Sequence, residues 1–321
     1  MAQVILETTS ENLPRQPAPI TNWAAIAGRW KFEGDTARYE GSDDPHSPLG
    51  IAIGSTRFRD GIISTQLKLE RNEQTTGGIV FGFQSLDAPY FIAALGGFDD
   101  AYSISEYRPG SGWVRQAGAG SLKNIVADDT HALVLDVRGQ AVRLTVNDVD
   151  VLDVVLNRPI EGTGIGLYAW DRSKIEFRAT KVIAVAPTVF VIMPFKEPFD
   201  TLYREVIVPV ATGLGFKVIR ADEIPGPGII LDDIQQQIEE AHVVVAEITK
   251  PNPNVFYELG YAHALKKPAV LLRQTDAAVP FDIHGYRAIP YSDTIGGKKM
   301  VERHLQQHLN AVRKGMPESV A

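Results

Sequence analysis

Residues 23–186 carry the pattern of an antiparallel β protein, because apolar and polar positions alternate in short segments that turn residues separate. In 63–69, for example, Ile, Thr, Leu and Leu alternate with Ser, Gln and Lys, as expected of a strand with one buried face. Further strands are expected at 77–83, 90–95, 131–137, 141–146, 149–155, 165–169 and 175–183. Many short strands at regular spacing, with almost no helical period between them, predict an antiparallel sandwich.

From residue 187 onward, strand and helix patterns alternate. Strands are expected at 189–193, 217–220, 242–249 and 269–273, with a short fifth at 287–291, and helices at 199–212, 232–240, 252–265 and 294–314. Alternation of this kind predicts a small doubly wound domain with a parallel sheet. We therefore divide the chain into an N-terminal extension (1–22), a β-sandwich (23–186) and an α/β domain (187–321).

Composition narrows the classes of function. The 321 residues carry a formal net charge of −7 and no cysteine. This charge argues against general affinity for nucleic acid or anionic membranes, and the lack of cysteine excludes disulfides, thiolate nucleophiles and cysteine zinc sites. The N-terminus has no basic segment followed by a long apolar run, and no uncharged apolar stretch approaches the ~20 residues of a membrane span. We expect a cytoplasmic protein without a bound metal or cofactor.

The segment 252–265 holds the residue that most directly suggests chemistry. Asn252 is suited to cap a helix and Pro253 to occupy its first position, which places Glu258 in the second turn. That helix follows a buried strand, and open parallel sheets bind ligands beyond the carboxyl ends of their strands. In isolation Glu258 would be an ordinary surface glutamate, but in this context we interpret it as a catalytic carboxylate. Gly260, in mid-helix, predicts close approach by a strand or a ligand.

Several segments of the second half follow one another in an order typical of one superfamily. They lie at 189–195, 220–224, 228–230, 233–238 and 246–265. Through them the domain resembles the TIR-like and nucleoside 2-deoxyribosyltransferase-like superfamily, which implies a flavodoxin-like parallel sheet and cleavage of N-glycosidic bonds in nucleosides, nucleotides or NAD⁺. The resemblance assigns the catalytic carboxylate to Glu258, and it assigns the loop Met193-Pro194-Phe195 to the part that closes over the base or ribose.

The same resemblance implies a set of substrate-binding residues around the catalytic carboxylate. They are Met193, Pro194, Phe195, Asp222, Glu247, Asn254 and Tyr257. Simpler roles are open for four of them: helix capping for Asn254, turn chemistry for Asp222, packing for Tyr257 and a place in the core for Phe195. Two positions depart from the family, which often has aspartate where this chain has His242 and Glu247. The longer side chain of Glu247 would change how the ribose hydroxyls are held.

Cleavage of a C1′–N bond passes through an oxocarbenium-like state that a nearby carboxylate can stabilise or trap covalently. NAD⁺ carries a positively charged leaving group and needs no strong general acid. We therefore expect NAD⁺ as the substrate, with nicotinamide and ADP-ribose or its cyclic form as products. A neutral nucleoside would need a proton donor, for which Asp222, Glu223, Glu247 and His263 are suited by position.

Strand and turn segments of the first half carry a weaker resemblance. They lie at 28–32, 77–83, 90–91 and 144–148, and they are similar to concanavalin A-like jelly-roll sandwiches of the LamG and 3-keto-disaccharide hydrolase type. Such features support a fold more than a function. Loop-like segments could line a ligand surface with Asp99, Asp100, Ala101, Tyr102 and Trp113, although solvated turns and a half-buried tryptophan are the simpler interpretation. We interpret this half as a sensor, an oligomerisation platform, or both.

Together these expectations describe an effector of bacterial immunity or stress response. It would deplete NAD⁺ when the sandwich detects a small-molecule, nucleotide or glycan signal. Fusion of a binding module to a toxic catalytic module fits control by assembly, so a homo-oligomer is expected. The alternatives are a nucleoside or nucleotide hydrolase or 2-deoxyribosyltransferase, a non-catalytic nucleotide-binding or signalling scaffold, and a carbohydrate-binding protein governed by the sandwich.

Overall fold

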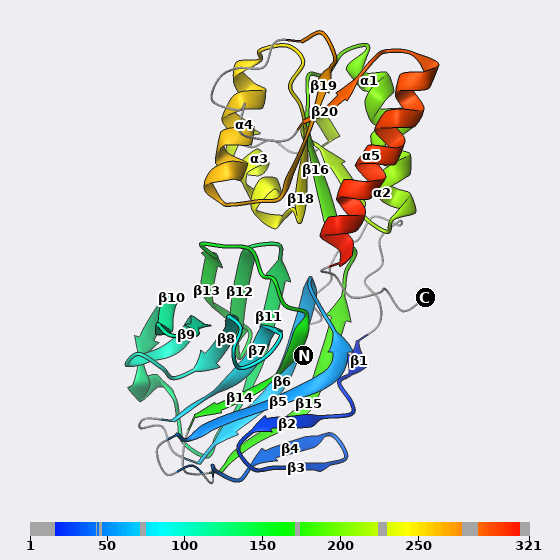
Figure 1. Ribbon diagram of the computed structural model, residues 1–321. Coiled ribbons are helices and arrows are strands. Elements are labelled where there is room, and N and C mark those ends of the chain that lie inside the picture. The colour runs from blue at the N-terminus through cyan, green and yellow to red at the C-terminus, as the bar shows by residue number, and fades with distance from the viewer. Residues whose placement is uncertain are drawn as a thin grey trace.

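The computed structural model describes residues 17–314 apart from 43, 45–46, 71–74, 171–173, 224–229 and 278–287. Two parts follow one another along the chain: an antiparallel β-sandwich, and a separate five-stranded parallel sheet with helices on both faces (Figure 1). The extension over 1–16, the motif residues 224 and 228–229, and Arg287 of the expected fifth strand lie outside the described residues. Within the described part of the chain, no helix is long and apolar enough to cross a membrane.

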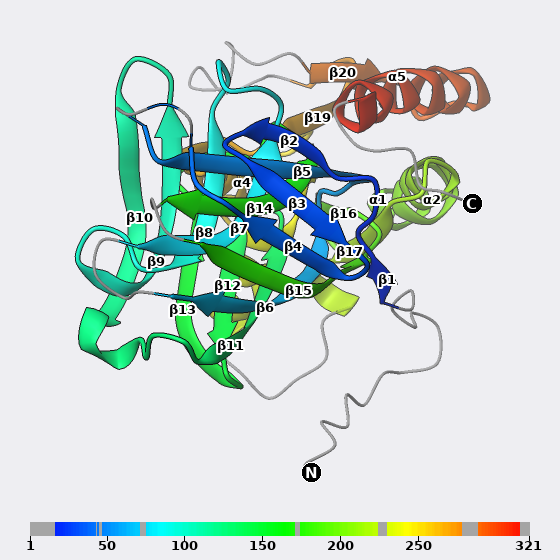
Figure 2. The same ribbon diagram turned by 90° about the horizontal axis from the view of Figure 1, so that it is seen from below.

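Two antiparallel sheets form the sandwich, which confirms the prediction from alternating positions (Figure 2). The first sheet runs in the order β13 (Val149–Val155), β12 (Ala141–Val146), β11 (Thr130–Arg138), β6 (Gly61–Leu69), β15 (Ile175–Ala184), β4 (Thr36–Tyr39) and β3 (Trp30–Glu33), with β1 (Ala18–Pro19) paired to β15. The second runs in the order β10 (Gly112–Ser121), β9 (Asp100–Arg108), β8 (Tyr90–Leu95), β7 (Thr76–Phe83), β14 (Gly164–Trp170), β5 (Leu49–Arg57) and β2 (Ala24–Ala27), and a short helix η1 (Leu122–Asn124) follows β10. Apolar side chains from the inner faces of both sheets form one continuous core.

The second sheet is apolar on its outer face as well as toward this core. Strand β6 of the first sheet keeps the expected alternation between buried and more exposed positions. Strands β7 and β8 of the second sheet, in contrast, are buried at every position. Aromatic side chains cover them from outside: the ring of Tyr90 lies 5.1 Å from that of Tyr107 and 5.8 Å from that of Trp113, between centroids. The outer face therefore carries a second, aromatic layer that simple alternation does not predict.

The α/β part is built on five parallel strands. Their order is β17 (Lys217–Arg220), β16 (Thr188–Ile192), β18 (Val243–Glu247), β19 (Ala269–Gln274) and β20 (Ala288–Tyr291). One face is covered by α1 (Phe199–Leu202), the π-helical turn η2 (Tyr203–Ile207), α2 (Val208–Gly213) and α5 (Ile295–Lys314), and the other by α3 (Ile230–Glu240) and α4 (Pro253–Ala264), while η3 (Ala221–Glu223) follows β17 (Figure 1). Alternate residues of β18 contribute to the core on each face, which explains its unbroken apolar run.

The helix expected at 199–212 forms, but its middle adopts a different geometry. Pro209 has no N–H to donate to the carbonyl four residues earlier. The preceding turn widens to π geometry, and Val208 N–H donates to Tyr203 O. Such widened turns often occur at functional sites. Here the turn carries Tyr203, whose ring contacts an arginine at the carboxyl edge of the sheet.

A buried backbone contact joins the two parts where the β11–β12 turn meets the C-terminal ends of α3 and α4. Gln140 N donates to Glu239 O at 3.0 Å, and the Gln140 side-chain amide donates to Leu265 O at 2.9 Å. Gly139 has a φ of 57°, and a Cβ at this position would come within 2.6 Å of Glu240 O. A residue without a side chain is therefore required for this close approach.

Three ionisable side chains are buried at the same junction. Asp60, between β5 and β6, has its Oδ2 2.9 Å from Nδ1 of His242, which precedes β18. Lys267 donates to the carbonyl oxygens of Glu239 and Ala241 at the end of α3, and burial lowers the pKa of Lys267 to about 7. The sandwich and the α/β part thus share a polar interface in addition to the covalent connection between β15 and β16.

Candidate functional site

Glu258 lies on α4, the helix that follows the central strand β18. The Asn252 side chain accepts a hydrogen bond from Asn254 N at 3.0 Å, and Pro253 begins the helix. The helix therefore starts as predicted and places Glu258 in its second turn. Close approach of a strand to Gly260 is not found, since a Cβ there would meet nothing within 4 Å, and approach by a ligand stays a prediction.

The Glu258 carboxyl group is partly buried and, among the described residues, has no hydrogen-bond or ion-pair partner. Burial is the cause that raises its pKa from 4.5 to about 7. The ionised form lacks the donors and counter-charges that usually compensate a carboxylate for lost hydration. A carboxylate in this condition is a candidate for interaction with a cationic group of a ligand.

Glu258 belongs to the helix that follows β18, and β18 lies at the point where the order of the parallel strands reverses. Strands β16 and β18 are neighbours, yet the helix after β16 packs on one face of the sheet and the helix after β18 on the other (Figure 1). In doubly wound sheets the ligand binds where two such connections diverge. Phe195 belongs to the connection after β16, and Glu258 belongs to the helix after β18.

Arg220, at the end of β17, organises the residues next to this point. Its Nε and Nη2 each donate to one carboxylate oxygen of Asp222 at 2.6 Å, and its Nη1 donates to Asp200 Oδ1 at 2.7 Å. The guanidinium carbon also lies 4.3 Å from the ring centroid of Tyr203 and 5.4 Å from that of Phe195. The carboxylate of Asp222, expected to bind substrate, is therefore engaged by an arginine in this structure.

The other expected substrate-binding residues differ in how far they reach the surface. Met193 and Pro194 are buried, whereas Phe195 and Tyr257 are each 52% exposed. The hydroxyl of Tyr257 accepts a hydrogen bond from an α3 glutamine side chain, and the side chain of Asn254 is exposed. Contact with a substrate stays a prediction for all of them. The exposed residues are the ones whose side chains a ligand can reach directly.

Glu247, at the end of β18, has a carboxyl group that is already engaged within the protein. It is buried and accepts hydrogen bonds from the backbone N–H and hydroxyl of Thr249 and from the hydroxyl of Tyr291 at 3.0 Å. Burial raises its pKa, and these hydrogen bonds act in the opposite direction. The arrangement ties the ends of β18 and β20 together at the edge where the ligand is expected.

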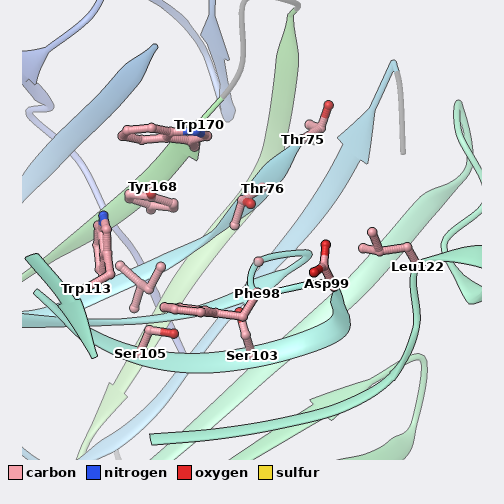
Figure 3. Close-up of a pocket in the computed structure, with 12 residues that line it drawn as sticks. Thr75, Thr76, Phe98, Asp99, Ser103, Ser105, Trp113, Leu122, Tyr168 and Trp170 are labelled. Carbon is pink, nitrogen blue, oxygen red and sulfur yellow. The ribbon is translucent and has the colours of Figure 1, made fainter. Parts of the chain in front are cut away.

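A second candidate site lies on the aromatic outer face of the sandwich. The structure has a pocket of about 310 Å³ there. Trp113, Tyr168 and Trp170 gather on one side of it, and Leu122 lies on the opposite side (Figure 3). Phe98 is also part of the lining. Large, mostly apolar pockets with a few polar groups are the usual form of small-molecule sites.

Polar groups in the pocket come mainly from β9 and the turn before it. Ser105 is fully buried, and within the described part of the chain its hydroxyl oxygen makes no hydrogen bond. Phe98 and Asp99 both have positive φ values, 55° and 65°, which are unusual for residues other than glycine. Of the residues expected to line a ligand surface, Asp99 and Trp113 do line this pocket. Asp100 instead forms an ion pair with Arg115.

No protein-family model matches the chain, and no curated protein matches its sequence. Several solved structures are similar to it. A carbohydrate-binding module from Bacillus subtilis is 16% identical with a TM-score of 0.42, over 51% of this chain and 96% of the other. A protein of unknown function with a galectin-like fold, also from Bacillus subtilis, is 13% identical with a TM-score of 0.40, over 54% and 97%. A native glycosidic hydrolase is 15% identical with a TM-score of 0.40, over 55% and 97%. Each match spans about half of this chain, and at these scores none of them assigns a function to it.

Three residues that matter at the two sites and the junction between the parts were not singled out from the sequence. The sequence places Arg220 in the strand 217–220 and in the segment 220–224, and Gln140 in the turn between two expected strands, but it indicates no contact for either residue and none for Asp60. One local signal existed for the first of them, because an arginine two residues before an aspartate at a strand end can form a bidentate pair within one turn. The contacts of Asp60 and Gln140 cross between the two parts, and no local pattern encodes them.

Proposed function

We propose that the α/β domain is a TIR-like N-glycosidase that cleaves NAD⁺ to nicotinamide and ADP-ribose or its cyclic form, with Glu258 as the catalytic carboxylate. The observation that carries this proposal is the partly buried carboxyl group of Glu258, which has no partner among the described residues and lies on the helix that follows β18, a strand at the point where the strand order reverses. The spatial order of the strands, 2-1-3-4-5 in chain sequence, supports a flavodoxin-like fold. This proposal includes the role of an effector in bacterial immunity or stress response.

The proposed reaction uses the charge of Glu258 directly. The C1′–N bond breaks, and its electron pair leaves with the nicotinamide nitrogen, which becomes neutral. The ribose carbon becomes oxocarbenium-like, and the Glu258 carboxylate stabilises it electrostatically or as a transient ester. Water then adds to C1′ and releases a proton, which yields ADP-ribose. Attack by a hydroxyl or ring nitrogen of the same molecule would instead yield a cyclic product.

The surroundings favour NAD⁺ over a neutral nucleoside, because the three carboxyl groups expected to donate a proton are engaged elsewhere. Burial lowers the pKa of His263, the fourth candidate, which disfavours its protonated form. Asp222 forms a bidentate pair with Arg220, and Glu223 accepts a hydrogen bond from the hydroxyl of Tyr203 at 2.7 Å. Glu247 is buried among its own donors. A neutral base needs protonation to leave, whereas nicotinamide leaves from a cationic state without it.

The choice between these substrates is tested by measuring base release chromatographically from NAD⁺ and from a panel of nucleosides and deoxynucleosides. We expect nicotinamide release to exceed release of any neutral base by ~100-fold or more in kcat/KM, the order of magnitude that one well-placed general acid supplies. Equal or faster cleavage of a nucleoside would instead favour a nucleoside hydrolase or a 2-deoxyribosyltransferase.

The rate of NAD⁺ cleavage is expected to depend on pH through the ionisation of Glu258. Because the carboxylate is the active form and its pKa is raised to about 7, kcat/KM should increase from pH 5.5 to about pH 8 and level off above that pH. The measurement is initial rate of nicotinamide release across this range. A profile that decreases with pH would mean that Glu258 acts as an acid, which contradicts the proposed role.

The pocket of the sandwich supports a second function, recognition of a small uncharged ligand with hydroxyl groups, such as a carbohydrate. Trp113, Tyr168 and Trp170 offer flat apolar faces, and the unpartnered hydroxyl of Ser105 offers a hydrogen bond. We propose that this ligand is the signal that controls the α/β domain. Assembly of several copies is the proposed means of control.

Ligand binding at this pocket is expected to depend on Trp113. Trp113→Ala removes one aromatic wall, so the dissociation constant of any sugar found in a glycan-binding screen should increase about 10-fold or more. The matched control is Trp23→Ala, since Trp23 is an aromatic residue of the sandwich outside the pocket lining. If both variants lost binding equally, or if neither lost it, the ligand would not bind in this pocket.

A further inference from the structure

Phe195 is about half exposed to solvent, yet its aromatic ring is held by a contact with Arg220. It directly follows the buried residues Met193 and Pro194, and 52% of its surface is accessible. A residue that only completed the core at this strand end would be buried like its two neighbours. Its ring instead lies against the guanidinium group of Arg220, with 5.4 Å between the guanidinium carbon and the ring centroid.

Arg220 is itself fixed by contacts to two different segments. Asp222 in η3 engages its Nε and Nη2, and Asp200 in α1 engages its Nη1, all at 2.6 to 2.7 Å. The aromatic ring of Tyr203 also contacts the guanidinium group, with 4.3 Å between the ring centroid and the guanidinium carbon. The arginine side chain is only 10% exposed. A planar guanidinium group held by two carboxylates has little freedom to turn, so it offers the ring of Phe195 a fixed support.

These contacts also limit what Arg220 can do with a ligand. Its forked donors face Asp222 and Asp200, so a phosphate group of a nucleotide would have to displace a carboxylate to reach them. The side chain is better placed to support its neighbour than to bind an anion. Phe195 and Glu258 come from the two connections that diverge at the reversal point of the sheet.

We infer that Arg220 is a positioning residue that holds Phe195 as a stacking platform for the planar base of the substrate. This inference rests on the proposed N-glycosidase function and on the substrate-binding role that the resemblance gives to Phe195, and it adds the residue that holds the ring in place. Stacking on an aromatic ring tolerates different bases, because every base has a π face. The platform therefore contributes to substrate binding, and the chemical step depends on Glu258.

The test compares Phe195→Leu, which keeps apolar bulk but removes the planar ring, with Phe195→Tyr, which keeps the ring. For nicotinamide release from NAD⁺, Phe195→Leu should raise KM on the order of 10- to 100-fold and leave kcat within about threefold, the range expected for one lost base-stacking contact. Phe195→Tyr should remain close to the wild type. An unchanged KM in Phe195→Leu would overturn the inference.

Arg220→Lys retains the positive charge but removes the planar guanidinium group that contacts the ring of Phe195. The ring should therefore no longer be held in one position. We expect KM to rise as in Phe195→Leu, and the double variant to be no worse than Phe195→Leu alone, because both changes act through one ring. The matched control is Arg143→Lys, which alters an exposed forked pair with Asp153 on the sandwich. Fully additive increases in KM would show that Arg220 acts independently of Phe195 and would overturn its positioning role.

A binding measurement separates failure of this inference from failure of the proposed reaction. If the wild type releases no base, the N-glycosidase proposal fails, and Phe195→Trp then reports on the platform directly. Titration with NAD⁺ should quench the added tryptophan fluorescence relative to the wild type, because a stacked base quenches an indole ring in contact with it. Absence of that quenching would overturn the platform as well.

Discussion

Glu258→Gln is expected to abolish base release from NAD⁺ and to stabilise the folded protein at the same time. Glutamine keeps the size and polarity of the side chain but cannot carry the negative charge that an oxocarbenium-like state requires. Loss of a preorganised charge of this kind lowers kcat on the order of 10³-fold. The measurement is nicotinamide release, with Glu161→Gln as the control, since Glu161 is an exposed glutamate of the sandwich.

The gain in stability follows from the raised pKa of Glu258. The group has a pKa of about 7 in the folded protein and an ordinary value of 4.5. Between these values the unfolded chain has already lost the proton that the folded protein retains, so the free energy of unfolding decreases as pH rises through this window. Above about pH 7 Glu258 is ionised in the folded protein as well, and the free energy of unfolding does not decrease further on its account. Discounted for partial exposure of the carboxyl group, the total decrease is on the order of 1–2 kcal/mol.

Thermal unfolding at two pH values tests whether the ionised Glu258 lowers the stability of the folded protein. Glu258→Gln should melt a few degrees above the wild type at pH 8, and the difference should become small near pH 4.5, where Glu258 is protonated in the folded protein and only about half ionised in the unfolded chain. A variant that is less stable than the wild type at pH 8 would show that Glu258 has a stabilising partner. The interpretation of this residue as an uncompensated functional carboxylate would then fail.

Asp60→Ala is expected to have the largest effect on stability, because it breaks the polar interface between the two parts. The carboxylate is buried, its Oδ2 lies 2.9 Å from His242 Nδ1, and its Oδ1 accepts the N–H of Gly139 at 2.9 Å. Alanine leaves both groups buried without this acceptor, at a cost of about 2–4 kcal/mol. Thermal unfolding should show a lower melting temperature for Asp60→Ala.

The matched control for this variant is Asp153→Ala. Asp153 also pairs with a basic side chain, Arg143, at 2.7 Å, but its side chain is 61% exposed. An exposed pair contributes about 0–1 kcal/mol, so the melting temperature should change little. Limited proteolysis adds a second readout: cleavage between β15 and β16 should be faster in Asp60→Ala than in either the control or the wild type. Equal behaviour of the two variants would contradict a shared interface.

Local periodicity predicted an antiparallel sandwich followed by a parallel sheet with helices, but it did not identify strands β5, β9 and β10. Alternation at 63–69 correctly indicated β6, and the apolar run in 242–249 correctly indicated a strand buried on both faces. The start of α4 followed from Asn252 and Pro253, because capping is a local interaction. These features depend on residues a few positions apart, and sequence patterns contain that information directly.

The remaining features depend on contacts between distant segments. Strands β7 and β8 are buried throughout because an aromatic layer from other strands covers them. Arg220 is held by Asp200, 20 residues earlier in the chain, and supports Phe195, 25 residues earlier. The position of Glu258 on α4 could be predicted, but the absence of a partner for its carboxyl group within the described part of the chain could not. That absence depends on which side chains the fold brings near it.

The most direct test of the account is simultaneous chromatographic measurement of nicotinamide and ADP-ribose from NAD⁺, for wild type and Glu258→Gln. Both proteins would be measured in dilute solution and under crowding that promotes assembly. The account predicts equimolar release of nicotinamide and of ADP-ribose or its cyclic form by the wild type, and release at least ~10³-fold slower by Glu258→Gln. Equal release by both proteins, or none by the wild type under either condition, would contradict it.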